Sequence, residues 1–162
     1  MDWQRRCAVC LMAAVAASAG GGCEGPKPAP APRVTIRGRS WRVELATTAE
    51  QRYRGLSDRE GLEADAGMLF IYPAPDVLEF CMRQCLIPLD VAYIDANLRV
   101  VKTYTMPAEP YGLDQRTYSS LVPAQYALEV PAGSLAAAGV NVGDTVEFSP
   151  DVPAATKAEA GP

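Results

Sequence analysis

The sequence predicts a mainly β fold: a single jelly-roll-like β-sandwich or barrel with one or two short helices. Short apolar segments separated by turn residues recur along residues 33–150. The helical patterns between them are too short to cover a parallel sheet. Hydrophobic residues make up 49% of the 162 residues and charged residues 21%, so the bulk of the chain should fold.

The expected elements are justified in chain order. Two strand-like segments, 34–37 and 41–45, flank a Gly-Arg-Ser turn and predict a hairpin. Thr47 and Glu50 have the spacing of a capping box, and Gly55 is a suitable stop, which predicts a helix of about two turns. The remaining pattern predicts strands at 67–72, 77–82, 89–94, 99–105, 126–130 and 145–148, one helical turn at 134–138, and an irregular stretch at 106–123.

Residues 1–22 have the three parts of a secretory signal peptide: a basic start, a short apolar core and a small-residue exit. Cys23 follows three glycines in the manner of a bacterial lipobox, which predicts that this cysteine is lipidated. We therefore expect an exported, membrane-anchored lipoprotein of the cell envelope. The alternative is a soluble secreted or periplasmic protein. A twin-arginine signal at Arg5-Arg6 is a further interpretation.

Three segments follow the signal peptide. Residues 23–32 combine the lipidated cysteine with a Pro/Ala tether, and such segments are semi-rigid spacers. Residues 33–150 form the predicted β domain. Residues 151–162 are rich in Pro, Ala and Glu and predict a disordered tail.

Composition excludes several function classes. The formal net charge is −4, whereas nucleic-acid binding favours a basic face, so we expect no nucleic-acid partner. The chain has no histidine, which excludes Ser-His-Asp and Cys-His catalysis and His-based zinc sites. We expect no catalytic residues, no cofactor and no bound metal.

Several motifs occur in a characteristic order. They are Arg52-x-x-Gly55-Leu56 with Arg59, Gly67-Met68-Leu69-Phe70, Phe80-x-Met82-Arg83, Ile87-Pro88-Leu89-Asp90-Val91-Ala92-Tyr93-Ile94-Asp95, Pro123-Ala124-x-Tyr126-Ala127-Leu128-Glu129-Val130 with Ala132-Gly133, and Gly143-Asp144-x-Val146. Together they resemble the bacterial and archaeal domain-of-unknown-function family 192. The resemblance implies a mainly β fold that is often exported, and it implies no established activity.

The chain departs from that family pattern in two places. The family usually has Gly-Leu-Met where this chain has Gly55-Leu56-Ser57, and Phe-Trp-Met-Lys-Asn-Thr where it has residues 80–85. Cys81 and Cys85 stand at two of the altered positions, and one disulfide between them would explain both changes. Exported proteins keep disulfides, but the bond requires a turn at residues 83–84. The alternatives are two free thiols and metal ligation.

The candidate ligand-binding residues are Arg52, Arg59, Arg83, Asp90 and Tyr118. The three guanidinium groups could converge on a carboxylate or phosphate. The tyrosine borders the irregular stretch, where Tyr111, Tyr118 and Tyr126 could stack on a sugar or peptide. The structural alternative pairs Arg83 with Asp90, and Arg59 with Glu60 or Asp65, and makes the tyrosines packing residues.

The leading functional hypothesis is an envelope-associated, non-catalytic β domain that binds a small ligand, a cell-wall component or an envelope partner. The alternative is a thiol-dependent redox or copper-handling protein that uses Cys81 and Cys85, because thiolate and thioether ligands favour copper(I).

Overall fold

The computed structural model describes residues 30–109, 116–153 and 155. The predicted signal peptide, Cys23, most of the tether and the end of the tail lie outside the described residues. No helix among the residues described has the length and apolar character needed to cross a membrane.

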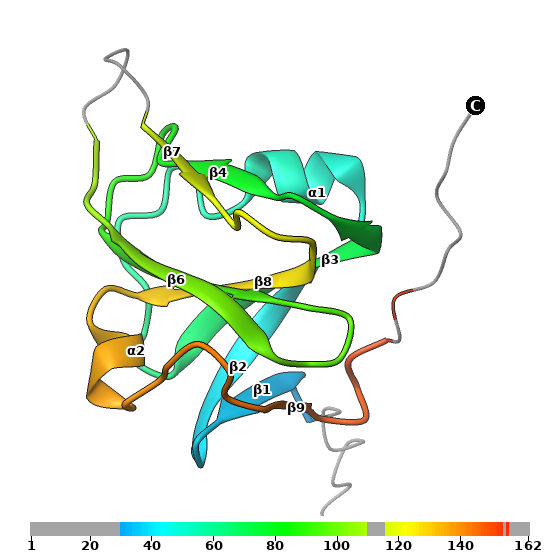
Figure 1. Cartoon of the computed structure of the whole chain (residues 1–162). Helices are drawn as coiled ribbons and strands as arrows, with labels where there is room; N and C mark the ends of the chain where they lie inside the picture. Colours follow the sequence, from blue (N-terminus) through cyan, green and yellow to red (C-terminus); the bar gives the residue numbers. More distant parts are fainter. Residues whose placement is uncertain (1–29, 110–115, 154, 156–162) are drawn as a thin grey trace, which may run out of the picture.

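A seven-stranded sheet forms the body of the domain (Figure 1). The strands follow the order β6-β5-β8-β3-β2-β1-β9, and every pair is antiparallel except β2 and β3. Their bounds are β1 (Arg33–Ile36), β2 (Arg39–Ala46), β3 (Ala66–Asp76), β5 (Leu89–Ile94), β6 (Val100–Met106), β8 (Ala124–Pro131) and β9 (Val146–Phe148).

The sheet curls into a half-barrel, which confirms the predicted mainly β class. An isolated bridge between Arg99 and Thr145 joins the loop before β6 to the segment before β9, so the two ends of the sheet approach each other. Backbone hydrogen bonds from Val100 N to Asp144 O and from Val146 N to Leu98 O reinforce this junction. Of the two predicted architectures, the observed one is therefore closer to a barrel.

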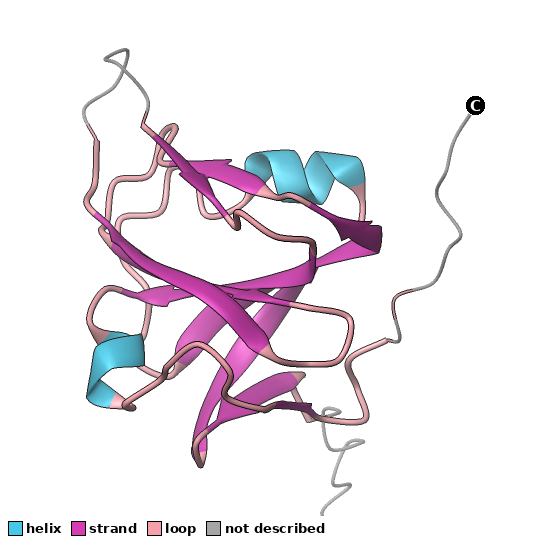
Figure 2. Cartoon of the chain, viewed as in Figure 1, coloured by secondary structure: helices cyan, strands magenta, loops and turns pink. Residues whose placement is uncertain are grey.

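Smaller elements cover the two faces of the sheet. The helix α1 (Ala49–Arg54) and the two-stranded β4 (Glu79–Cys81) and β7 (Thr117–Ser119) lie on one side, and α2 (Ser134–Ala137) lies on the other (Figures 1 and 2). The central strand β5 is buried at all six positions because both faces are covered.

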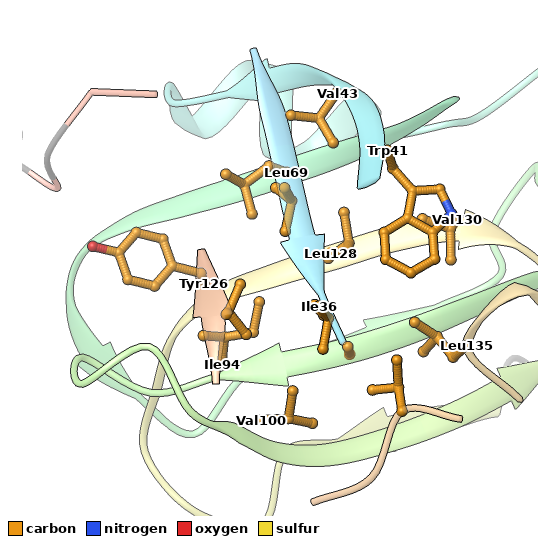
Figure 3. Packing of buried hydrophobic residues seen from close by; sticks show 14 of the residues in the cluster. Ile36, Trp41, Val43, Leu69, Ile94, Val100, Tyr126, Leu128, Val130 and Leu135 are labelled. Carbon is orange, nitrogen blue, oxygen red and sulfur yellow. The ribbon is translucent and has the colours of Figure 1, made fainter. Parts of the chain in front are cut away.

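Two hydrophobic clusters result from this arrangement. The first contains Trp41, Leu69 and Leu128 and packs against α2 and β9 (Figure 3). The second lies between the opposite face of the sheet and α1, β4 and β7, and it contains Phe70 and Tyr93. Successive side chains of a strand point to opposite faces of the sheet, so neighbouring residues belong to different clusters.

The structure corrects three local predictions. β3 continues past the predicted stop at Pro73 and ends at Asp76. Its register with β8 shifts between Ile71 and Asp76, so the prolines in this segment do not have to donate a hydrogen bond to the neighbouring strand. β7 forms inside the stretch predicted to be irregular, through its pairing with β4. The ordered chain also passes Asp151, since Val152 is only 9% exposed and belongs to the first cluster.

Helix α1 begins one residue later than predicted. Thr48, rather than Thr47, is the N-cap: its Oγ1 accepts a hydrogen bond from Gln51 N, and the Gln51 side chain accepts one from Thr48 N. This is a capping box with glutamine at its third position. Gly55 ends the helix with φ of 51°, a left-handed conformation that favours glycine.

Candidate functional site

A cavity of about 200 Å³ lies at the end of helix α1, on the side of the sheet that carries β4. We call it the α1 cavity. It is lined by the end of α1 and the residues that follow, by strands β3, β4 and β8, and by the turn after β4. The lining residues are Arg52, Tyr53, Arg54, Gly55, Leu56, Ser57, Phe70, Tyr72, Glu79, Phe80, Cys81, Arg83, Cys85 and Glu129.

Glu129 is the buried acid of this cavity. It stands in the middle of β8, opposite Met68 of β3 and Val91 of β5, and it is 4% exposed. No described residue donates a hydrogen bond to its carboxyl group, and its oxygens are not among the fully enclosed unpaired atoms of the described residues, which are Trp41 Nε1, Glu109 Oε2 and Tyr118 OH. Burial alone raises its pKa to about 8, so the free protein carries a protonated Glu129 at neutral pH.

The groups around Glu129 keep their protons too. Burial raises the pKa of Tyr72, and it raises that of Cys85 to about 12, with the Glu129 charge acting in the same direction. The pKa of Tyr93 is also raised, first by burial and then by Glu129, and its hydroxyl donates a 2.7 Å hydrogen bond to Tyr118 O. Of the described groups whose pKa burial raises at this cavity, Glu129 is the one that is brought close to physiological pH.

Aromatic rings form part of the wall. The centroids of Phe70 and Phe80 are 4.9 Å apart, and those of Phe80 and Tyr93 are 5.5 Å apart, both edge to face. These rings position an apolar surface beside the acid.

Two of the three predicted arginines meet at the cavity. Arg52 donates hydrogen bonds from Nη1 to Thr47 O (2.5 Å) and Ile71 O (2.9 Å) and lies 4.8 Å from the Tyr72 ring centroid. Arg83 Nη2 donates a hydrogen bond to Tyr53 O (2.7 Å), and Arg83 Cζ lies 3.8 Å from the centroid of the Tyr53 ring. Neither forms a salt bridge within the described ranges. Both guanidinium groups therefore have fixed positions and N–H donors to spare.

Arg59 is not part of this constellation. It forms a bidentate pair with Glu44, with N–O distances of 2.5 and 2.6 Å, rather than with Glu60 or Asp65. This hydrogen bond lowers the pKa of Glu44. Asp65 pairs instead with Arg42. Arg59 therefore lies in an ion pair outside the α1 cavity.

Asp90, which was predicted as a ligand-binding residue, is buried and has its hydrogen-bond partners inside the domain. Its carboxylate accepts hydrogen bonds from Thr105 Oγ1 (2.7 Å) and from Leu135 N (2.9 Å) at the start of α2. It is absent from the lining of the α1 cavity. Its predicted alternative partner, Arg83, binds the Tyr53 carbonyl instead.

We expect Asp90→Ala to lower the free energy of unfolding by about 2 kcal/mol or more, because it leaves the buried Leu135 N–H unpaired. Chemical denaturation checks this, with Asp151→Ala at an exposed position as the control. Unchanged stability together with lost ligand binding would contradict the structural role.

Tyr118 is also a packing residue. It is 6% exposed, its ring lies 5.5 Å from that of Tyr104, and it does not line the α1 cavity. Its carbonyl accepts the hydrogen bond from Tyr93. Because β7 pairs with β4, the side chain turns inward and is unavailable for stacking on a ligand.

Cys81 and Cys85 are free thiols in the structure, so the predicted disulfide is not formed here. The chain does turn after β4, with Cys85 N bonded to Met82 O and Gln84 at a φ of 57°. The turn leaves the two residues at different depths, Cys81 exposed and Cys85 buried. Both line the α1 cavity.

We expect iodoacetamide to alkylate Cys81 at least tenfold faster than Cys85 in the native protein without reductant. Only the thiolate reacts, and burial raises the pKa of Cys85 to about 12. Peptide mass spectrometry at successive times measures both rates. Protection of both cysteines until a reductant is added would instead demonstrate a disulfide.

The positions that depart from the family pattern converge at this cavity. Ser57, Cys81 and Cys85 all belong to its lining, and Ser57 Oγ donates to Arg83 O. The sequence changes therefore alter the walls of one site rather than scattered surface positions.

The described part of the chain has no group of three or more Cys, Asp or Glu side chains arranged to hold a metal ion.

Sequence reasoning did not select Glu129. The signal was present as a lone acid in the apolar run from Tyr126 to Val130. A lone acid in an apolar run indicates a buried carboxyl group only if its strand is covered on both faces, and the sequence does not show that β8 is such a strand.

Two solved structures share this fold. A protein of unknown function from Novosphingobium aromaticivorans DSM 12444 is 34% identical with a TM-score of 0.65, covering 71% of this chain and 83% of its own. A protein from Sinorhizobium meliloti 1021, described as a candidate transcription regulator, is 30% identical with a TM-score of 0.63, covering 72% of this chain and 91% of its own. The search of curated proteins gave no match.

The family comparison agrees with the motifs and with the fold. The family model of DUF192, described as Uncharacterized ACR, matches residues 32–148, which include every strand and both helices of the structure. The chain belongs to the DUF192 family.

Proposed function

We propose that this protein is an envelope lipoprotein whose β domain binds a small ligand in the α1 cavity without transforming it. The observation that carries the proposal is Glu129: a carboxyl group 4% exposed, opening on a cavity, with no hydrogen-bond donor from the described residues. Buried polar groups are normally hydrogen-bonded, because an unpaired one costs stability. A ligand that pairs with Glu129 would offset that cost.

The size of the cavity limits the ligand. Sites for drug-sized molecules usually have volumes of about 300–1,000 Å³, and the α1 cavity has about 200 Å³. It suits a metabolite-sized molecule or the end group of a cell-wall component.

Export and anchoring rest on the sequence of residues 1–32. Mass spectrometry of the membrane fraction tests them: we expect an acylated N-terminal peptide that begins at Cys23. A soluble mature form that begins downstream of Cys23 would contradict the anchor.

The two alternatives have less support. Thiol chemistry needs a thiolate, whereas burial keeps Cys85 protonated. The description of the S. meliloti protein concerns regulation of transcription, but a net charge of −4 disfavours DNA binding here.

A thermal-shift screen of organic acids, amines, amino acids and sugars on the full chain tests ligand binding, because a specific binder stabilises the native state. Hits are mapped by amide chemical shifts. We expect changes at Gly55, Phe80 and Glu129, and altered affinity in Glu129→Gln. The control Glu147→Gln changes an exposed glutamate of β9 and should bind normally. Binders that perturb only residues outside the lining would contradict the proposal.

A further inference from the structure

We infer that the ligand of the α1 cavity is a small zwitterion, whose protonated amine meets Glu129 and whose carboxylate meets Arg52 and Arg83. This inference rests on the proposed function and specifies its ligand class. It follows from the distribution of charge over the cavity lining, which has Glu129 in its interior and, nearer the solvent, three arginines (Arg52, Arg54 and Arg83) against one exposed acid, Glu79.

The interior end favours a cation. An ionised Glu129 can only accept hydrogen bonds, and an ammonium group offers three donors and no acceptor. The nearby Tyr93 hydroxyl is already committed as a donor to Tyr118 O, so it leaves Glu129 unpaired. The rings of Phe70 and Phe80 beside it add surfaces that attract cations. An anionic group placed here would be repelled by ionised Glu129 and could pair only with the protonated carboxyl group.

The outer end favours a carboxylate. Arg52 is held by two backbone carbonyls and the Tyr72 ring, Arg83 is held by one backbone carbonyl and the Tyr53 ring, and both are only partly buried. Their hydrogen bonds use Nη1 of Arg52 and Nη2 of Arg83, so other N–H groups remain for a ligand. Because the side chains are already positioned, binding costs little side-chain entropy.

The pH dependence of binding distinguishes this pairing from other contacts of Glu129. The titratable and charged groups around the cavity are Tyr72 on β3, Tyr93 on β5, Glu79 and Cys81 on β4, Arg52, Tyr53 and Arg54 on α1, and Asp58, Arg83 and Cys85 in the adjoining loops. Glu129 must lose its proton to pair with an amine, and its pKa in the free protein is about 8. Affinity should therefore rise about tenfold from pH 6 to pH 7 and level off above pH 8.

Calorimetric titration of the full chain with matched probes tests the inference. The probes are the amino acids from glycine to 6-aminohexanoate, the carboxylic acids of equal length that lack the amine, and the amines that lack the carboxylate. We expect at least one amino acid to bind at least tenfold more tightly than both of its matched analogues. At pH 7 its binding should release close to one proton to the buffer.

Variants show which residue binds the amine and which residue binds the carboxylate of the ligand. Glu129→Gln should remove the preference for the amino acid over the matched acid and abolish the pH dependence. Arg83→Gln should remove the preference over the matched amine and keep the pH dependence. The control Glu147→Gln should preserve both preferences.

Two results would overturn the inference, and they differ in whether the proposed function is also contradicted. If a neutral molecule or a simple acid binds at the cavity residues with affinity that falls above pH 8, Glu129 acts as a proton donor. The proposed function then stands and the zwitterion does not. If no probe of any class perturbs the cavity residues, both are wrong.

Discussion

Glu129→Gln is expected to unfold at a higher temperature than the wild-type protein at pH 8.5, with a difference that shrinks as the pH falls to 5. The pKa of Glu129 is about 8 in the folded protein, because burial disfavours its charge, against an ordinary value of 4.5. Between these values the native state binds one more proton than the unfolded state. Stability therefore falls as the pH rises through this window, by on the order of 1 kcal/mol per pH unit.

Above pH 8 both states have lost the proton, so this contribution stops changing. Below pH 4.5 both states hold the proton, and the wild-type protein should resemble the variant. No histidine titrates between pH 4.5 and pH 8, because the chain has no histidine. Scanning calorimetry of the wild-type protein, Glu129→Gln and the control Glu147→Gln at pH 5, 6, 7 and 8.5 gives the comparison. Parallel pH profiles for the wild-type protein and Glu129→Gln would contradict a buried, protonated Glu129.

Gly67→Ala is expected to destabilise the protein by about 1–3 kcal/mol. A Cβ at Gly67 would lie 2.6 Å from Glu129 O and 3.0 Å from Val130 Cγ1. The first neighbour is backbone of β8, which cannot move without disturbing its pairing with β3 and β5. The variant should therefore also displace Glu129 and weaken ligand binding.

Gly61→Ala is the matched control for this prediction. Gly61 is exposed, and a Cβ there meets no atom within 4 Å. Urea denaturation of both variants measures the difference. Equal midpoints would show that β3 and β8 do not approach as closely at Gly67 as the structure indicates.

Local sequence patterns predicted the strands because burial follows simple rules there. The strand β5 was predicted at 89–94 and occupies Leu89–Ile94, since five of its six residues are apolar and suit a strand that is buried on both faces. The strand β7 was not predicted, because its three residues are extended only through their pairing with β4, which is distant in sequence. The continuation of β3 past Pro73 also depends on tertiary context, namely its shift of register against β8.

The candidate site was only partly predictable for the same reason. The motifs concentrate between Arg52 and Asp95, and of the predicted site residues in this span the structure brings Arg52 and Arg83 to the cavity. Side-chain types could not show that Arg59 pairs with Glu44 or that Asp90 caps α2, because those partners are distant in sequence. The acid that defines the cavity, Glu129, comes from a strand that reaches the site only when the sheet assembles.

The measurement that tests this account most directly is a carbon-13 NMR titration of the Glu129 carboxyl group in the ligand-free full chain. Assignment by comparison with Glu129→Gln identifies its resonance. The account predicts a titration midpoint at about pH 8, caused by burial without a hydrogen-bond donor. A midpoint near the ordinary value of 4.5 would show that water or a protein group already satisfies the carboxylate. It would contradict the unpartnered acid on which the binding site depends.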